Sequence, residues 1–352
     1  MLLLLRSKGL FMFEKQRPAP LAALASYAAI ALATLIWLAP IWSGFDLFRQ
    51  AWALVAGAVL FAVLFAALVR RWKRFWISLA GLAAICVPVI PELWGSLNSQ
   101  HYAPYPANST LLSVGTHNLW GRNSEASNAT ATLVEMNADV LALQEAFGES
   151  GDVTTELRSH YAYEANCTRH STRLLSNLEI IESGCMQDLL IASLPTQAEW
   201  WRHQFPPSTW ARIRLRNGET AVVVAVHMTW PDPLSVQNEQ RRNLAQQLQQ
   251  FDQDRLIVLG DFNAASPSIA LSRMERDFGL ERRTFLLPTW PSQGIGQRFG
   301  FGDIPVPTMF TGIDHVFAGD AWTTLSVDRG PNTGSDHRPV MVQLGGWDRA
   351  AE

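Results

Sequence analysis

Lysine is missing from most of this chain: no lysine follows Lys73, although the sequence runs to 352 residues. Residues 1–94 hold nine of the 28 basic residues and three of the 31 acidic residues. The remainder therefore carries 19 arginines against 28 acidic side chains, a net charge of −9. Proteins that bind nucleic acid through its phosphates normally have more basic than acidic residues. The composition disfavours a general nucleic-acid-binding protein and leaves room only for a local arginine patch.

Charge is also missing from three long apolar runs near the N-terminus. The runs are Pro20–Trp42, Ala51–Val69 and Phe75–Leu93, and the only charge in them is Glu92, at the end of the third. A helix needs roughly 20 apolar residues to cross the hydrocarbon core of a bilayer, and each run is long enough. A signal peptide followed by buried core helices is the alternative. Three successive runs of this length favour a membrane anchor over residues 1–94, with three transmembrane helices.

No basic residue lies between Gly95 and Gly121, whereas basic residues crowd the other side of the runs. The second loop is the cluster at residues 70–74, and the N-terminal tail carries Arg6, Lys8, Lys15 and Arg17. Because loops rich in Lys and Arg stay in the cytoplasm, we expect a cytoplasmic N-terminus in the cell (inner) membrane. The residues after the third run are then periplasmic or extracellular. The lack of ionisable side chains within the runs favours an anchor over a transporter or channel.

Cysteine is scarce, with three in the chain. Cys86 lies in the third apolar run and is interpreted as a packing residue. Cys167 and Cys185 lie in the part predicted to be exported, where an oxidising compartment permits a disulfide. A disulfide and two buried free thiols both remain compatible with the sequence.

After residues 95–109, which are rich in Ser, Asn, Pro and Tyr and are interpreted as a linker, the pattern becomes β-rich. Helical spacing occurs at Ala126–Met136 and Gln237–Phe251. The expected strands are Leu111–Asn118, Val140–Leu143, Ala221–His227, Leu256–Leu259, Ile313–Ala318 and Val340–Leu344. These elements predict one domain over residues 110–346.

Polar side chains end, interrupt or precede these strands. They are Asn118, Glu145, His227, Asp261, Asn263, Asp314, Asp336 and His337. Each one alone has an ordinary explanation as a turn, a helix start or a core histidine. Together, in one domain, they indicate a hydrophobic frame whose polar groups converge at one rim, as a catalytic site requires.

The order and wording of these motifs resemble the endonuclease/exonuclease/phosphatase superfamily, which has the fold of pancreatic deoxyribonuclease. The resemblance extends over residues 111–344, essentially the whole predicted domain. It rests on HNLW (117–120), LQE (143–145), VHMTWP (226–231), LGDFNA (259–264), GIDHVF (312–317) and GSDHRPV (334–340). It implies an α+β fold, a four-layer α/β/β/α sandwich of two packed sheets, and Mg²⁺- or Mn²⁺-dependent hydrolysis of phosphate esters.

The resemblance also implies roles for single residues. Glu145 would be the main metal ligand, helped by Asn118 and Asp336. Asp261 would orient or deprotonate the attacking water, and Asn263 would hold that water or a phosphate oxygen. The phosphate contacts would come from His227 and from His337, whose protonated form Asp314 would favour. His315 is interpreted as structural.

The sequence does not decide the roles of Arg173 and of the aromatic stretch, the partner of His227, or the substrate. Arg173 is compatible with a phosphate contact or a surface salt bridge, and the partner of His227 is not assigned. The aromatic stretch at residues 200–205, with Trp210 nearby, fits either a headgroup contact or an ordinary packed loop. The substrate is a phosphate ester of unknown class, and an anchor favours a lipid or envelope phosphodiester. The alternatives are an extracytoplasmic nuclease and an inactive, membrane-anchored binding module, although the module would be expected to lack one of the motif residues.

Overall fold

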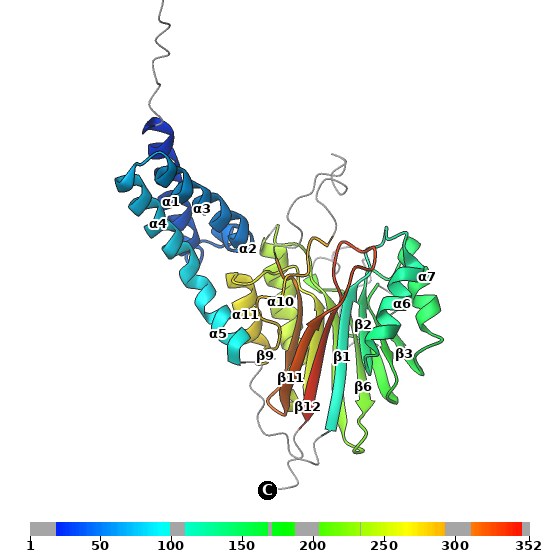
Figure 1. Ribbon diagram of the computed structural model, residues 1–352. Coiled ribbons are helices and arrows are strands. Elements are labelled where there is room, and N and C mark those ends of the chain that lie inside the picture. Colours follow the sequence, from blue (N-terminus) through cyan, green and yellow to red (C-terminus); the bar gives the residue numbers. More distant parts are fainter. Residues whose placement is uncertain are drawn as a thin grey trace, which may run out of the picture.

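The computed structural model describes residues 19–98, 110–167, 171–186, 204–232, 234–292 and 311–346. It contains an apolar helical part, residues 19–98, and a domain of two β-sheets with helices outside them (Figure 1). The helical part lies against one side of that domain, next to helices α10 (Leu234–Leu248) and α11 (Ile269–Phe278).

The N-terminal helical part is built from apolar helices that pack on one another. They are α1 (Ala19–Leu38), α2 (Asp46–Gln50), α3 (Trp52–Leu68), α4 (Trp72–Cys86) and α5 (Ile90–Asn98). Small and branched side chains such as Ala29, Val59 and Ile85 fill the space between α1, α3 and α4. Large apolar side chains such as Phe61 remain exposed on the outside, as expected for helices that meet lipid.

Two helices, Pro20–Leu38 and Trp72–Asn98, are long and apolar enough to cross a membrane. A third span requires the segments Ser43–Gln50 and Trp52–Leu68 to count as one, although they bend by 71° at their junction. Three spans were predicted from the sequence, and the described residues contain two or three. The segment before the bend, α2, contacts the β-sheet domain through Asp46 and Gln50, and the sequence does not reveal these contacts.

The predicted linker does not begin at Gly95. Residues 95–98 form the last turn of α5, and residues 99–109 lie outside the described part of the chain. The helix continues because it lies against the β-sheet domain. Gly95 is so close to the ring of Phe285 that a Cβ at this position would be 2.3 Å from it. The side chain of Glu92, one turn earlier, pairs with Arg282.

The first sheet has the order β11-β12-β1-β2-β4-β3. Its strands are β1 (Thr110–Asn118), β2 (Val140–Gln144), β3 (Tyr163–Asn166), β4 (Arg173–Ser176), β11 (Trp322–Arg329) and β12 (Val340–Gly346). Strands β1 and β2 are parallel, and the other neighbours are antiparallel.

The second sheet has the order β5-β6-β7-β8-β10-β9. Its strands are β5 (Ile180–Cys185), β6 (Ser208–Arg214), β7 (Thr220–His227), β8 (Leu256–Asp261), β9 (Glu281–Arg282) and β10 (Asp314–Ala318). Its parallel pair is β7 and β8. Each sheet thus has one central parallel pair, whose carboxyl ends carry predicted site residues.

The four-layer prediction is confirmed by the core. Side chains of both sheets, such as Val114 and Val223, form the cluster between them. Helices α6 (Ala126–Met136) and α7 (Gly151–Leu157) pack on the outer face of the first sheet. Helices α10 and α11 cover the outer face of the second sheet (Figure 1). The central strands β2, β8 and β10 are buried along their whole length, because the other sheet covers one face and helices cover the other.

The two cysteines of the β-sheet domain form a disulfide. Cys167 directly follows β3, and Cys185 is the last residue of β5. Their Cα atoms are 5.2 Å apart. The bond joins a strand of the first sheet to one of the second. Of the two alternatives that the sequence left open, the structure contains the disulfide.

Hydrogen bonds fasten α2 to the β-sheet domain. The carboxylate of Asp46 accepts from the backbone N–H groups of Ile269 (2.7 Å) and Ala270 (3.0 Å), at the start of α11. The Gln50 side chain accepts from the Ala265 N–H at 2.6 Å. Backbone N–H groups in the first turn of a helix lack partners within the helix, and a carboxylate there also meets the positive end of its dipole. The loop between the first two apolar runs is therefore a docking element as well as a connection.

Candidate active site

The predicted site residues meet at one rim of the sandwich because the strand registers bring their ends together. Asn118 lies opposite Gln144 in the parallel pair of the first sheet. Asp261 lies opposite His227 in β7 and opposite Asp314 in β10. Asp261 is thus flanked on both sides by other predicted site residues.

Asn118 joins the two halves of the site. Its side-chain amide donates to Glu145 Oε1 at 3.1 Å and to Asp261 Oδ2 at 2.9 Å. Its own oxygen accepts from the Trp120 N–H at 2.9 Å, which fixes the orientation of the amide. Two carboxylates from different sheets are therefore held within reach of one nitrogen atom.

Glu145 follows β2 in a left-handed backbone conformation, with φ of 53°. Strain of this kind is found at functional sites, where the surrounding structure maintains it. Burial acts to raise the pKa of Glu145, but His227, the Gly121 N–H and the Asn118 amide outweigh it and hold the pKa below its usual range. The carboxylate is thus kept ionised at the mouth of the site.

Asp261 is almost completely buried. Its Oδ1 accepts from the Asn263 N–H at 2.9 Å, and its Oδ2 lies 3.7 Å from the Nε2 atoms of both His227 and His337. Burial, together with the charge of Asp314, raises the pKa of Asp261 against the opposing effect of the two histidines. A carboxylate with a raised pKa is a better proton acceptor near neutral pH.

His337 lies between two buried carboxylates. Its Nδ1 is 2.9 Å from Asp314 Oδ2, which also accepts from the Thr289 hydroxyl at 2.5 Å. Burial opposes the protonated ring, but the charges of Asp314 and Asp261 and the bond to Asp314 prevail and raise the pKa of His337 to about 9. At neutral pH the ring is an imidazolium whose Nε2–H points toward Asp261. The predicted support of His337 by Asp314 is present in the structure.

His227 lies near Asp261 as well, and its second carboxylate neighbour is Glu145. Its Nε2 lies 3.9 Å from Glu145 Oε1 and 3.7 Å from Asp261 Oδ2, and its side chain is 20% exposed. The sequence left the partner of this histidine unassigned. The structure places its Nε2 near Glu145 and Asp261, in a side chain that is partly exposed to solvent.

Asn263 and Asp336 occupy the periphery of this group. The Asn263 amide donates to the Met228 carbonyl at 2.9 Å, and its backbone rather than its side chain contacts Asp261. Asp336 lies beside His337, with 4.0 Å between Oδ1 and Nε2, and accepts from the Trp290 indole N–H at 3.2 Å. Both residues therefore border the site and position its central groups.

The donor set fits a divalent metal ion. Asp261, Asp314 and His337 place potential ligand atoms within 4.8 Å of one another. The Nδ1 of His337 is already bonded to Asp314, which leaves only Nε2 of this ring for a metal ion. The oxygens of Glu145 and Asp261, gathered around the Asn118 amide, are the hard ligands that Mg²⁺ prefers. Asp261 belongs to both sets of potential ligands, the one with Asp314 and His337 and the one with Glu145. A metal ion at this rim is compatible with either set.

Sequence patterns did not reveal three residues that build the site. Thr289 and Trp290 hold Asp314 and Asp336 from a loop without periodic pattern. Ser335 donates to the Asn118 carbonyl at 2.7 Å and accepts from the His337 N–H at 3.0 Å. The one sequence signal for Ser335 is its place within GSDHRPV, beside Asp336 and His337.

The structure also decides some minor points. The His315 ring bonds to Thr284 and to the Ala264 carbonyl inside the core, which agrees with a structural role. Arg173 forms a salt bridge with Glu164 at 3.0 Å. Residues 200–203 of the aromatic stretch lie outside the described residues. Phe205 and Trp210 are buried, so these two side chains do not reach a membrane surface.

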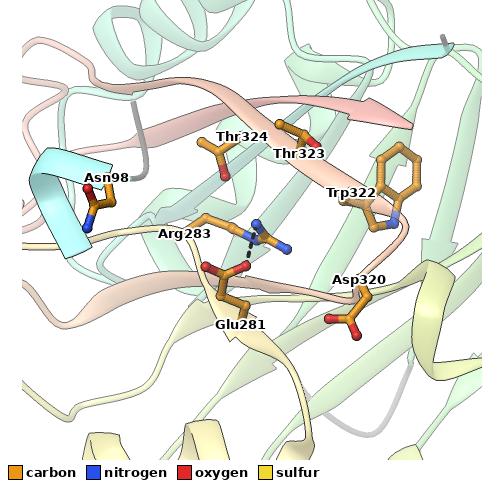
Figure 2. Close-up of a pocket in the computed structure, with 7 residues that line it drawn as sticks. All are labelled: Asn98, Glu281, Arg283, Asp320, Trp322, Thr323 and Thr324. Atoms are coloured by element: carbon orange, nitrogen blue, oxygen red, sulfur yellow. Dashed lines mark ion pairs between the residues drawn. The ribbon is translucent and has the colours of Figure 1, made fainter. Parts of the chain in front are cut away.

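A separate polar hollow of about 350 Å³ lies at the other end of the sheets, where β11 begins. Figure 2 shows Arg283 in it, paired with Glu281 at 2.8 Å, while Asp320 and Trp322 line its far side. Trp322 pairs with Gly346 at the end of β12, the opposite end from the site residue His337. The hollow contains none of the predicted site residues.

A two-sheet sandwich with carboxylates and histidines gathered at one rim provides proton acceptors and donors of the kind that hydrolysis of phosphate esters requires. The Endonuclease/Exonuclease/phosphatase family model matches residues 115–337. The chain belongs to this family, whose members are hydrolases that generally depend on divalent metal ions. No match is found among curated proteins.

Solved structures share the fold at low sequence identity. An endonuclease/exonuclease/phosphatase family protein from Bacteroides thetaiotaomicron is 16% identical, over 68% of this chain and 99% of that one, with a TM-score of 0.51. The protein SmcL is 17% identical, over 68% of this chain and 99% of its own, with a TM-score of 0.50. These similarities establish the fold of the β-sheet domain.

Proposed function

We propose that the chain is a membrane-anchored phosphoesterase that depends on Mg²⁺ or Mn²⁺ and acts outside the cytoplasm. The observation that carries this proposal is the convergence of Glu145, Asp261, His227 and His337 around the Asn118 amide. The site combines ionised oxygen ligands, a buried carboxylate with a raised pKa and an imidazolium. Hydrolysis of a phosphate ester needs a positioned water, neutralised phosphoryl oxygens and help for the leaving oxygen.

The metal ligands proposed are Glu145 as the main one, with Asn118 and Asp336. A divalent ion bound there would neutralise charge on the phosphoryl oxygens and lower the pKa of a bound water. Glu145 suits this role because its neighbours keep it ionised. Asn118 has a second role besides that of a ligand. Its amide nitrogen donates to Glu145 Oε1 and so fixes the direction of this carboxylate.

The other side chains have separate tasks. Asp261 accepts a proton from the attacking water or orients that water through Oδ2, while the Asn263 N–H holds Oδ1 in place. His337 presents a positively charged Nε2–H to a phosphoryl oxygen, because Asp314 holds its Nδ1. His227, the more exposed of the two histidines, donates to the phosphate or the leaving oxygen. Each such donor, in a site partly shielded from water, typically contributes on the order of 10²–10³ in rate.

The membrane location is supported by the apolar N-terminal helices and by the loop charges. The basic cluster at residues 70–74 and the basic N-terminal tail favour the cytoplasm, which leaves the β-sheet domain outside. The Cys167–Cys185 disulfide suits an oxidising compartment. The net charge of −9 after residue 94 argues against a nuclease that binds DNA by charge.

The direct test is a substrate panel with the full-length chain in lipid nanodiscs and Mg²⁺ or Mn²⁺. The panel contains bis-(p-nitrophenyl) phosphate, plasmid DNA, sphingomyelin, phosphatidylinositol and inositol phosphates. We expect EDTA-sensitive turnover of at least one member, lost in His337→Ala and kept in His160→Ala, which removes an exposed histidine. Turnover that survives both EDTA and His337→Ala contradicts the mechanism.

The same panel separates the two other candidate functions. Strong nicking of plasmid DNA, without hydrolysis of any lipid, would favour an extracytoplasmic nuclease. No turnover and no Mn²⁺ binding would favour an inactive binding module. The presence of the metal-binding oxygens, both histidines and Asp261 in one cluster argues against such a module.

A further inference from the structure

An apolar cavity of about 300 Å³ lies where the N-terminal helical part meets the active-site rim. On one side it is lined by Leu47 of α2, by Leu54 of α3 and by Ala51 at the junction between these helices. Trp230, Trp290 and Ile313 line it from the β-sheet domain. Its volume is at the lower end of ligand sites, roughly 300–1,000 Å³, so it has room for part of an apolar ligand.

The cavity and the active site share two walls. Trp290 lines the cavity while its indole N–H bonds to Asp336, the neighbour of His337. Asn263 also lines the cavity while its backbone N–H bonds to Asp261. A molecule whose phosphate lies at His337 and Asp261 therefore has an apolar space directly beside that phosphate.

The other wall of the cavity is continuous with α3, an apolar helix that is proposed to lie in the membrane. Leu47 and Leu54 are 44% and 49% exposed, and α3 carries no charged residue along its length. This wall is held in place, because Asp46 and Gln50 bond to backbone groups of the β-sheet domain. The cavity thus lies between the exposed surface of an apolar helix and two residues, Asn263 and Trp290, that bond to Asp261 and Asp336.

Gln50 adds a polar feature to this wall. Its side-chain oxygen accepts from Ala265, but its amide nitrogen is buried and has no hydrogen-bond partner among the described residues. A buried donor without a partner destabilises the fold.

We propose that this cavity binds a hydrocarbon chain of the substrate, so that the phosphate ester cleaved belongs to a membrane lipid. The proposal rests on the phosphoesterase function above and narrows it to one substrate class. The headgroup phosphate would lie among His227, His337 and Asp261, and the first part of one chain would lie between Leu54 and Trp290. The rest of the chain would stay in the bilayer beside α3, so that the lipid need not leave the membrane.

The binding step can be tested without turnover, using the full-length chain in nanodiscs with EDTA. The probe is phosphatidylglycerol with a photoactivatable diazirine in one acyl chain, and the crosslinked residues are mapped by mass spectrometry. We expect crosslinks at the junction of α2 and α3 and around Trp230 and Trp290. Leu54→Trp fills the cavity and should reduce these crosslinks, whereas Leu64→Trp, the same change at an exposed position farther along α3, should not. Equal labelling in both variants overturns the proposal.

The catalytic consequence is tested with two diesters that share a p-nitrophenyl leaving group. One is bis-(p-nitrophenyl) phosphate, and the other carries a long-chain alcohol in place of the second ring. We expect Leu54→Trp to lower the ratio of long-chain to short-chain kcat/KM about tenfold, the factor expected when about two methylene groups lose their burial. Leu64→Trp should leave this ratio unchanged.

The outcomes separate the two proposals. Metal-dependent turnover of the short diester without any preference for the long chain would overturn the lipid inference and leave the phosphoesterase standing. Absence of EDTA-sensitive turnover of either diester would overturn the proposed function and, with it, the lipid as a substrate. The crosslinking result would then decide only whether the cavity holds a hydrocarbon chain.

Discussion

His337 and Asp314 form a buried pair that bridges the two sheets: the imidazole Nδ1 lies 2.9 Å from the carboxylate Oδ2. Asp314 begins β10 in the second sheet, and His337 stands just before β12 in the first. The pair sets both the orientation and the charge of the ring, and it spans the seam where the substrate phosphate is proposed to bind.

Replacing Asp314 with Asn should move the alkaline limb of the pH–rate profile to lower pH. In the native chain the pKa of His337 is raised to about 9, so activity that needs the imidazolium falls as the pH rises through that value. Without the Asp314 charge, burial of the ring is opposed less strongly and the pKa drops. The measurement is kcat/KM for a soluble diester across neutral and alkaline pH. Asp328→Asn, at an exposed aspartate, is the control, and an unmoved limb in Asp314→Asn would refute this account.

The same pair should link stability to pH. The folded pKa of His337 lies above its ordinary value of 6.5, so its stabilising contribution is complete below about pH 6.5 and is lost as the pH rises through about 9. Thermal unfolding of the native chain should therefore shift to lower temperature over this interval. In His337→Gln that part of the pH dependence should be absent.

Glu145→Gln should weaken metal binding more than any other substitution of a site residue. The amide keeps the shape of the side chain but loses the charge that would hold the cation, so we expect activity to fall about 100-fold or more. The rise in melting temperature on adding Mn²⁺ should shrink in parallel. Glu182→Gln on the exposed strand β5 is a matched control. A full Mn²⁺ response in Glu145→Gln would place the metal elsewhere.

Glu92→Gln should destabilise the contact between the N-terminal helical part and the β-sheet domain. Glu92 and Arg282 are both buried, with 2.7 Å between their charged atoms. Removing one partner of a buried ion pair costs about 3–5 kcal/mol, and Glu275 keeps the loss near the lower figure. Limited proteolysis and thermal unfolding in detergent measure the effect. Glu179→Gln, in an exposed pair with Arg214, should change either value by no more than about 1 kcal/mol.

The orientation of the chain is open to a reporter experiment. Alkaline phosphatase is active only after export, so a fusion after Asn98 should be active and a fusion after Arg71 inactive. The expectation follows from the basic cluster at residues 70–74 and the lack of cations from Gly95 to Gly121. Moving positive charge into the Ser43–Gln50 loop should weaken this pattern. The reverse result, with activity only at Arg71, would place the catalytic domain in the cytoplasm.

Local patterns were sufficient to predict much of the fold and the centre of the site. The predicted helix Ala126–Met136 has the same bounds in the structure, and strands such as Val140–Leu143 differ by one residue. Alternation and apolar runs report burial directly, so the strand ends followed from them. The site residues at those ends were found for the same reason.

Contacts between distant segments were not predictable in this way. Thr289 and Trp290 support Asp314 and Asp336 from an irregular loop, and nothing in their local sequence marks them. Asp46 and Glu92 looked like loop and end-of-span charges, whereas both are buried partners of the β-sheet domain. The attachment of α2 through Asp46 and Gln50 is likewise tertiary and leaves no periodic pattern.

The position of Asp46 at the start of α11 has a consequence for how the protein is made. Ribosomal synthesis releases Asp46 and Glu92 long before Ile269 and Arg282, the groups they bind. The later domain thus matures against a surface that is already in place, where Asp46 accepts from the first N–H groups of α11. A truncated chain that begins after Asn98 would lack both partners, so a secreted version of this domain would need new residues to replace them.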